Sequence, residues 1–174
     1  MNKLIFIPRL QRERDKFETL LNRVGFKRQM TMKGVWGGLS IKDILADVLT
    51  REQFISDRLE EILHGETYVT STSHTALENF QHDYGYPDYE SPLIEKEKLS
   101  HLVTDKYRNI GVDDIVEQEL AAYSNIFTAL EKLSHEQFLD HDLYHRVGEH
   151  TYKSYRRAGV EIHRWLQSIA SESK

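Results

Sequence analysis

The sequence predicts an all-α fold, organised as a four-helix bundle. Apolar residues recur every three or four positions along four separate segments, which is the pattern of a helix that buries one face. Only three prolines occur among the 174 residues, so most of the chain is free to be helical. We expect one domain over residues 1–174, because a chain of this length can bury a core of its own.

The first two predicted helices are joined by a short, glycine-rich loop, which makes them antiparallel neighbours. Pro8 suits the first position of a helix, where its missing amide proton is not needed, and Gly25 is a natural stop. The second helix is expected to begin after Ser40. This residue is a potential N-cap, and Asp43 follows three positions later in the manner of a capping box.

The third and fourth predicted helices cover about residues 112–133 and 151–169, from the spacing of their apolar residues. A connection of about 45 residues precedes the third helix and is long enough to run back along the bundle. We therefore expect the second and third helices to be parallel, in an up-down-down-up order. Within the connection, residues 66–91 hold several aromatic side chains without a sustained period, whereas residues 92–107 favour a short additional helix.

Composition narrows the possible functions. The net charge of −5 argues against a protein dedicated to nucleic acid, which would carry a basic face. The absence of cysteine excludes disulfides, thiolate catalysis and thiolate zinc sites, and it suits a reducing compartment. No apolar stretch is long enough to span a bilayer. We expect a cytoplasmic protein with neither a nucleic-acid nor a membrane partner.

Two glutamates interrupt the apolar stripes. Glu52 lies on the stripe of the second predicted helix, and Glu119 lies on that of the third. A carboxylate at such a position is costly unless it is paired, hydrogen-bonded or beside a wet cavity. One interpretation is a structural ion pair with an arginine such as Arg51. The other is a polar pocket inside one half of the bundle.

Spacing gives little support to a metal centre. A di-iron carboxylate site in a bundle needs Glu-x-x-His on two helices, and only Glu61 and His64 have this spacing. We therefore expect neither a metal nor another cofactor.

Two segments resemble the DinB-like superfamily of helical bundles. The run from Trp36 to Asp47, which reads WGGLSIKDILAD, resembles the opening of the second helix in that superfamily. The stretch from His150 to Tyr155, which continues to a Trp-Leu pair at 165–166, is similar to its last helix. Within the superfamily, the nearest likeness is to the ClbS/DfsB-type branch.

The resemblance has consequences for metal binding and function. Many DinB-like proteins bind a divalent metal through three histidines, whose matching positions here are Asp47, Ser154 and Ala158. Alanine cannot be a ligand, so the triad is absent, as it is in the ClbS/DfsB-type branch. The resemblance implies a pocket between the second, third and fourth helices, frequent homodimerisation, and roles in stress or toxin resistance.

We predict a metal-free protein that binds a small molecule and hydrolyses or sequesters it. The candidate catalytic residues are Glu52 or Glu119, whose pKa apolar walls would raise, and His150 as a partner. Further residues are expected to line the same pocket: Trp36, Asp47, Tyr123, Ser154 and Tyr155.

Two alternatives stay open. One is a metalloenzyme with rearranged ligands, namely Asp47, Glu52 and His150. The other is a non-enzymatic interaction module that uses the tyrosine-rich segment, residues 68–89, because tyrosines offer a large contact area with a polar tip. The same aromatic side chains would also be suited to fold back over the bundle.

Overall fold

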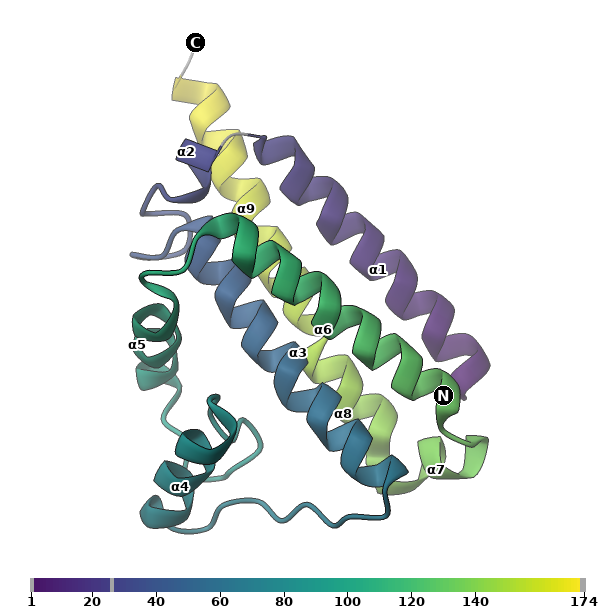
Figure 1. The fold of residues 1–174 in the computed structure, drawn as a ribbon. Helices are drawn as coiled ribbons and strands as arrows, with labels where there is room; N and C mark the ends of the chain where they lie inside the picture. The colour runs from purple at the N-terminus through teal and green to yellow at the C-terminus, as the bar shows by residue number, and fades with distance from the viewer. Residues whose placement is uncertain (1, 26, 173–174) are drawn as a thin grey trace.

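The computed structural model describes residues 2–25 and 27–172, and it confirms the all-α class (Figure 1). Within those residues the only β-type pairing is an isolated bridge between Trp36 and Leu39. None of the described helices combines the length and apolar character needed to cross a membrane. The helical elements are α1 (Lys3–Val24), α2 (Lys27–Met30), α3 (Ile41–Leu63), α4 (His74–Tyr84), α5 (Lys96–Tyr107), α6 (Val112–Lys132), α7 (His135–Leu139), the 3₁₀ turn η1 (Asp140–Asp142), α8 (Leu143–His150) and α9 (Tyr152–Glu172).

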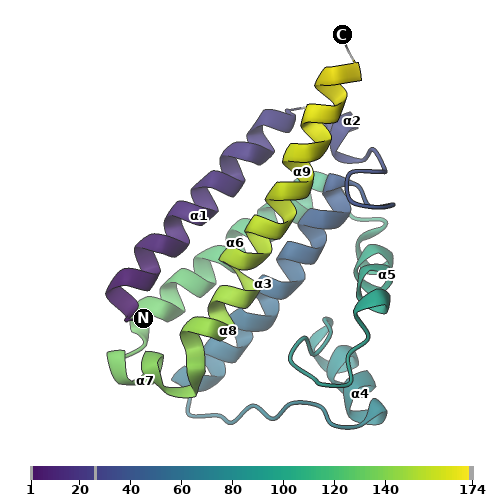
Figure 2. The same cartoon turned by 180° about the vertical axis from the view of Figure 1, so that it is seen from behind.

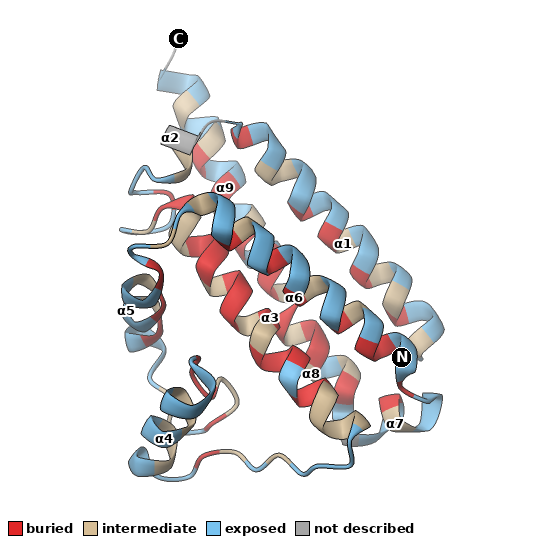
Figure 3. Cartoon of the chain, in the orientation of Figure 1, coloured by how far each residue is buried: buried red, intermediate tan, exposed pale blue. Residues whose placement is uncertain are grey.

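The long helices α1, α3, α6 and α9 form the body of the molecule. Helices α1 and α9 run in one direction, and α3 and α6 run in the other (Figures 1 and 2). Helix α3 packs mainly against α6, and α1 packs mainly against α9. Their inward faces carry the buried residues, whereas much of the outer surface of α1 and α6 is exposed (Figure 3).

The helix starts are set by local capping. Ser40 and Asp43 form the predicted capping box at the start of α3, each side chain accepting the backbone N–H of the other residue. Helix α1 differs from the prediction, because it begins at Lys3 and Pro8 lies inside it. The side chain of Asn2 accepts the N–H of Ile5 there and supplies a stronger start signal than the proline.

The connection between α3 and α6 lies beside the body and carries α4 and α5 (Figures 1 and 2). Helix α5 packs on α3 and corresponds to the additional helix expected in residues 92–107. Helix α4 was not predicted. None of its residues is buried. Its apolar residues at helical spacing, Leu77, Phe80 and Tyr84, are too few to stand out among the polar residues around them.

Candidate functional site

A polar cluster inside the body takes one residue from each long helix: Arg14 from α1, Glu52 from α3, Glu119 from α6 and Tyr155 from α9. Arg14 donates from Nη2 to Oε2 of Glu119 at 2.5 Å. The Tyr155 hydroxyl donates to Oε2 of Glu52 at 2.7 Å. All four residues are buried. Both carboxylates therefore lie in the interior, as their positions on apolar stripes suggest.

The two carboxyl groups of this cluster influence each other's pKa. Burial and the nearby Glu119 charge raise the pKa of Glu52 well above its ordinary value. Burial also raises the pKa of Glu119, although Arg14 opposes the shift. The Oε1 atoms of Glu52 and Glu119 have no donor among the described residues. A single proton on Glu52, donated to Glu119, would satisfy both atoms and agrees with the raised pKa of Glu52.

Arg14 was not anticipated as the partner of this pair. Sequence reasoning suggested Arg51, but Arg51 donates from Nε to Oδ2 of Asp47, four residues earlier on α3, at 3.2 Å. The signal for Arg14 was weak, because its helix also carries several exposed charged side chains. Its guanidinium also lies 5.3 Å from the centre of the Tyr123 ring, which brings Tyr123 to the edge of the cluster.

A separate surface pocket of about 660 Å³ lies between α3, α5 and the loop that precedes α3. It contains two of the predicted pocket residues, Trp36 and Asp47, and Trp36 is 40% exposed. The lining also includes apolar and charged side chains of all three segments: Lys33, Leu39, Asp43, Ile44, Arg51, Lys96, Leu99, His101 and Val103.

His150 lies apart from the carboxyl pair. Its ring packs against Phe54 and Tyr89, with centroids 5.0 and 6.0 Å away. Burial, reinforced by nearby arginines, lowers the pKa of His150 to about 3, so the ring is neutral at physiological pH. Its Nδ1 atom has no hydrogen-bond partner among the described residues.

The structure thus divides the predicted pocket residues instead of gathering them. Glu52, Glu119, Tyr123 and Tyr155 belong to the interior cluster, and Trp36 and Asp47 belong to the surface pocket. The division has a simple origin in α3. Positions 47 and 52 are five residues apart, which turns their side chains by about 140° around the helix axis. Ser154 is also buried, and among the described residues no side-chain hydrogen bond joins it to either group.

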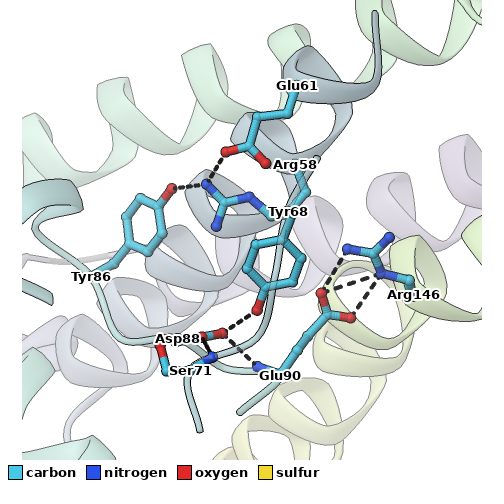
Figure 4. Close-up of polar contacts among 8 residues, drawn as sticks. All are labelled: Arg58, Glu61, Tyr68, Ser71, Tyr86, Asp88, Glu90 and Arg146. Atoms are coloured by element: carbon cyan, nitrogen blue, oxygen red, sulfur yellow. Dashed lines mark hydrogen bonds and ion pairs between the residues drawn. The ribbon is translucent and has the colours of Figure 1, made fainter. Parts of the chain in front are cut away.

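The tyrosine-rich segment folds back over α3. The Arg58 side chain of α3 is fully buried, with its guanidinium 4.8–5.2 Å from three ring centres of the segment. Arg58 donates from Nη2 to Oε1 of Glu61 at 2.7 Å and to the Tyr86 hydroxyl at 3.3 Å; both contacts are drawn in Figure 4. The rings concerned are Tyr68, Phe80 and Tyr84.

Further contacts fix the end of this segment. The Asp88 carboxylate accepts the Tyr68 hydroxyl and, at 2.8 Å, the backbone N–H of Ser71. Glu90 forms a two-pronged ion pair with Arg146 of α8, which is also drawn in Figure 4. Sequence reasoning missed Arg58. Its apolar neighbours on the stripe of α3 were the one available signal, since an arginine there needs both rings and an anion around it.

The rearranged metal site is not assembled. Among residues 2–25 and 27–172, no three histidine, aspartate or glutamate side chains converge in a way that could hold a metal ion. The proposed ligands Asp47, Glu52 and His150 lie in the three separate surroundings described above.

Comparison with known proteins identifies the fold alone. No family model matches the chain, and no curated protein matches its sequence. A crystal structure of an uncharacterised protein from Escherichia coli UTI89 superposes with a TM-score of 0.72 at 11% identity, covering 97% of this chain and 95% of that one. A crystal structure of a protein from Streptococcus pneumoniae gives 0.69 at 11% identity, covering 96% and 91%.

Proposed function

We propose that this protein is a metal-free four-helix bundle of the DinB-like superfamily, of the ClbS/DfsB type, which binds a small molecule. Helices α1, α3, α6 and α9 are the four helices of that bundle, in up-down-down-up order. The two segments that resemble the superfamily support this assignment by their positions. The run from Trp36 to Asp47 lines the surface pocket and opens α3, and the stretch from His150 to Tyr155 leads into α9.

The surface pocket is the observation that carries the proposal. Its volume of about 660 Å³ lies within the range of about 300–1,000 Å³ that is usual for small-molecule sites. Its walls combine apolar side chains with a few charged groups, which is the composition that such sites have. Trp36 lines this pocket and is partly exposed, so a bound molecule would cover more of it.

Binding and sequestration fit the geometry better than hydrolysis. The carboxyl groups of Glu52 and Glu119 are sealed in the interior, whereas a general acid must reach the reacting atom. A protein that sequesters a reactive compound needs only the pocket, which agrees with a role in stress or toxin resistance. The proposal includes a cytoplasmic location and a homodimer, the latter implied by the resemblance.

An interaction module built on the tyrosine-rich segment is less favoured. Several rings of that segment, among them Tyr68, Tyr84 and Tyr86, pack against Arg58 or Phe54 of α3. An interface that used the same rings would have to remove them from this packing first.

Fluorescence of Trp36 tests the proposed function. The chain has two tryptophans, so Trp165→Phe leaves Trp36 as the single reporter. We expect a screen of small aromatic and apolar compounds to yield saturable, one-to-one changes in its emission. Ser100→Phe places a ring in the pocket and should abolish these changes. The control Ser124→Phe, at an exposed position of α6, should leave them intact. Failure of every compound to give saturable binding, or equal binding by both phenylalanine variants, would contradict the proposal.

A further inference from the structure

Arg51 is fixed at the surface pocket by two contacts. Its Nε donates to Asp47 at 3.2 Å, and its guanidinium carbon lies 4.6 Å from the centre of the Tyr89 ring. The ring itself is anchored, since the hydroxyls of Tyr89 and Thr50 are 2.7 Å apart. A guanidinium held in this way has already lost most of its conformational freedom before any ligand arrives.

These contacts leave the outer nitrogens of Arg51 unused. No hydrogen bond joins Nη1 or Nη2 to any part of the chain that the structure describes, and the side chain is 21% exposed. A guanidinium presents its N–H groups as a planar fork that matches the two oxygens of a carboxylate or the oxygens of a similar anion.

The other charged groups of the pocket add a local positive balance. Lys33 is paired with Asp43 at 2.7 Å, as Arg51 is with Asp47. Lys96 also lines the pocket, and it has no acidic partner among the described residues. Three basic and two acidic side chains therefore face this pocket in a chain whose net charge is −5.

The remaining walls suit a flat apolar body. Trp36 contributes its partly uncovered indole, and Leu99 and Val103 contribute aliphatic surface from α5. Apolar area of this kind is recovered from water when a ring system lies against it.

We propose that the pocket selects an organic anion: an aromatic or other flat apolar body that carries a carboxylate or a comparable oxyanion. Arg51 is the residue that recognises the anionic group, Lys96 adds attraction at the rim, and Trp36 covers the apolar body. This inference rests on the proposed function and specifies the ligand class of the same pocket.

A matched pair of probes tests this selectivity. The fluorophore 8-anilinonaphthalene-1-sulfonate carries an anionic group, and N-phenyl-1-naphthylamine has the same ring system without it. We expect one-to-one binding of the sulfonate, tighter than that of the neutral probe and weakened by added salt. Arg51→Gln should weaken sulfonate binding by about tenfold or more, as expected for the loss of a charge-assisted hydrogen bond. Binding of the neutral probe should stay within about twofold.

Three further variants separate recognition from simple charge loss. Arg164→Gln changes the net charge equally, on an exposed part of α9, and should leave both probes unaffected. Arg51→Gln leaves the Asp47 carboxylate without its partner, and that charge could itself repel the sulfonate. The double variant Arg51→Gln with Asp47→Asn removes this repulsion, and sulfonate binding should still be weak. Lys96→Gln should weaken it about threefold through the lost attraction alone. Thermal unfolding checks that each variant is folded.

The results that would overturn the inference differ from those that would overturn the proposed function. If both probes bind equally well, or if Arg51→Gln and Lys96→Gln leave sulfonate binding unchanged, the pocket binds small molecules without selecting anions. If neither probe binds and no compound changes Trp36 emission, the proposed function fails, and the inference fails with it.

Discussion

At the scale of single residues, the interior carboxyl pair makes stability depend on pH. Burial and the Glu119 charge raise the pKa of Glu52 in the folded protein, whereas the unfolded chain titrates near the ordinary value of 4.5. The stability contributed by the bound proton is therefore complete below the ordinary pKa. It is lost as the pH rises toward the pKa of the folded state.

Glu52→Gln tests this coupling, because the amide replaces the protonated acid. Its oxygen can accept the Tyr155 hydroxyl and its nitrogen can donate to Glu119. We expect the variant to exceed the wild type in free energy of unfolding by about 1–3 kcal/mol near pH 8, with the difference shrinking toward zero near pH 4. Urea denaturation at several pH values measures it. A difference that is independent of pH would rule out the shared proton.

Glu119→Gln should have the opposite effect on stability. It removes the anion that compensates the buried Arg14 guanidinium, and breaking one side of a buried ion pair costs about 3–5 kcal/mol. The matched control is Glu161→Gln, whose partner Arg164 is mostly exposed and whose loss should cost less than about 1 kcal/mol. Chemical denaturation compares the two variants. Equal losses would mean that the Arg14 pair contributes no more than a surface pair.

At the scale of elements, the junction between α8 and α9 depends on a close approach. A Cβ atom at Gly148 would lie 2.7 Å from Cε1 of the Tyr152 ring. We expect Gly148→Ala to lower the free energy of unfolding by about 1–3 kcal/mol through this overlap. A Cβ atom at Gly159 in α9 would lie 3.6 Å from Cδ2 of Leu20, which is an ordinary contact. Gly159→Ala should therefore leave the free energy of unfolding unchanged or raise it by up to about 1 kcal/mol. Thermal unfolding that ranks the two variants in the reverse order would contradict this packing.

The attachment of the tyrosine-rich segment to α3 gives a second prediction at this scale. Arg58→Ala removes the cation that the rings surround, and it leaves Glu61 without this partner. We expect amide hydrogen exchange across residues 68–90 to accelerate far more than exchange in α6 or α9. Arg108→Ala, which removes an exposed ion pair with Asp105, should leave exchange in this segment unchanged. Uniform acceleration along the chain would show that Arg58 supports the whole fold and not this attachment.

Sequence patterns predicted the elements with strong local signals. The apolar stripes identified α3 and α6, and Ser40 with Asp43 marked the start of α3. The same patterns could not identify the short helix α4, none of whose residues is fully buried, or the early start of α1. The choice between Arg14 and Arg51 depends on which helices meet in space, and so does the separation of the two groups of candidate residues. Neither can be predicted from the periodicity of a single helix.

At the scale of the whole molecule, the proposed binding site lies outside the dry centre of the body. The four long helices meet around the buried cluster of Arg14, Glu52, Glu119 and Tyr155, whereas helix α5 leaves a pocket where it lies against α3. A ligand would therefore reach the proposed site without any opening of the core. The same arrangement explains why two residues of α3 lie in different surroundings: Asp47 lines the surface pocket, and Glu52 lies in the interior cluster.

The position of a bound molecule tests this account most directly. We propose to record backbone amide chemical shifts of the isotope-labelled protein during titration with 8-anilinonaphthalene-1-sulfonate. The account predicts shifts that saturate together and centre on residues 33–51 and 96–104, with little change around Arg14 and Glu119. Shifts centred on α1 and α6, or spread evenly over the chain, would contradict it.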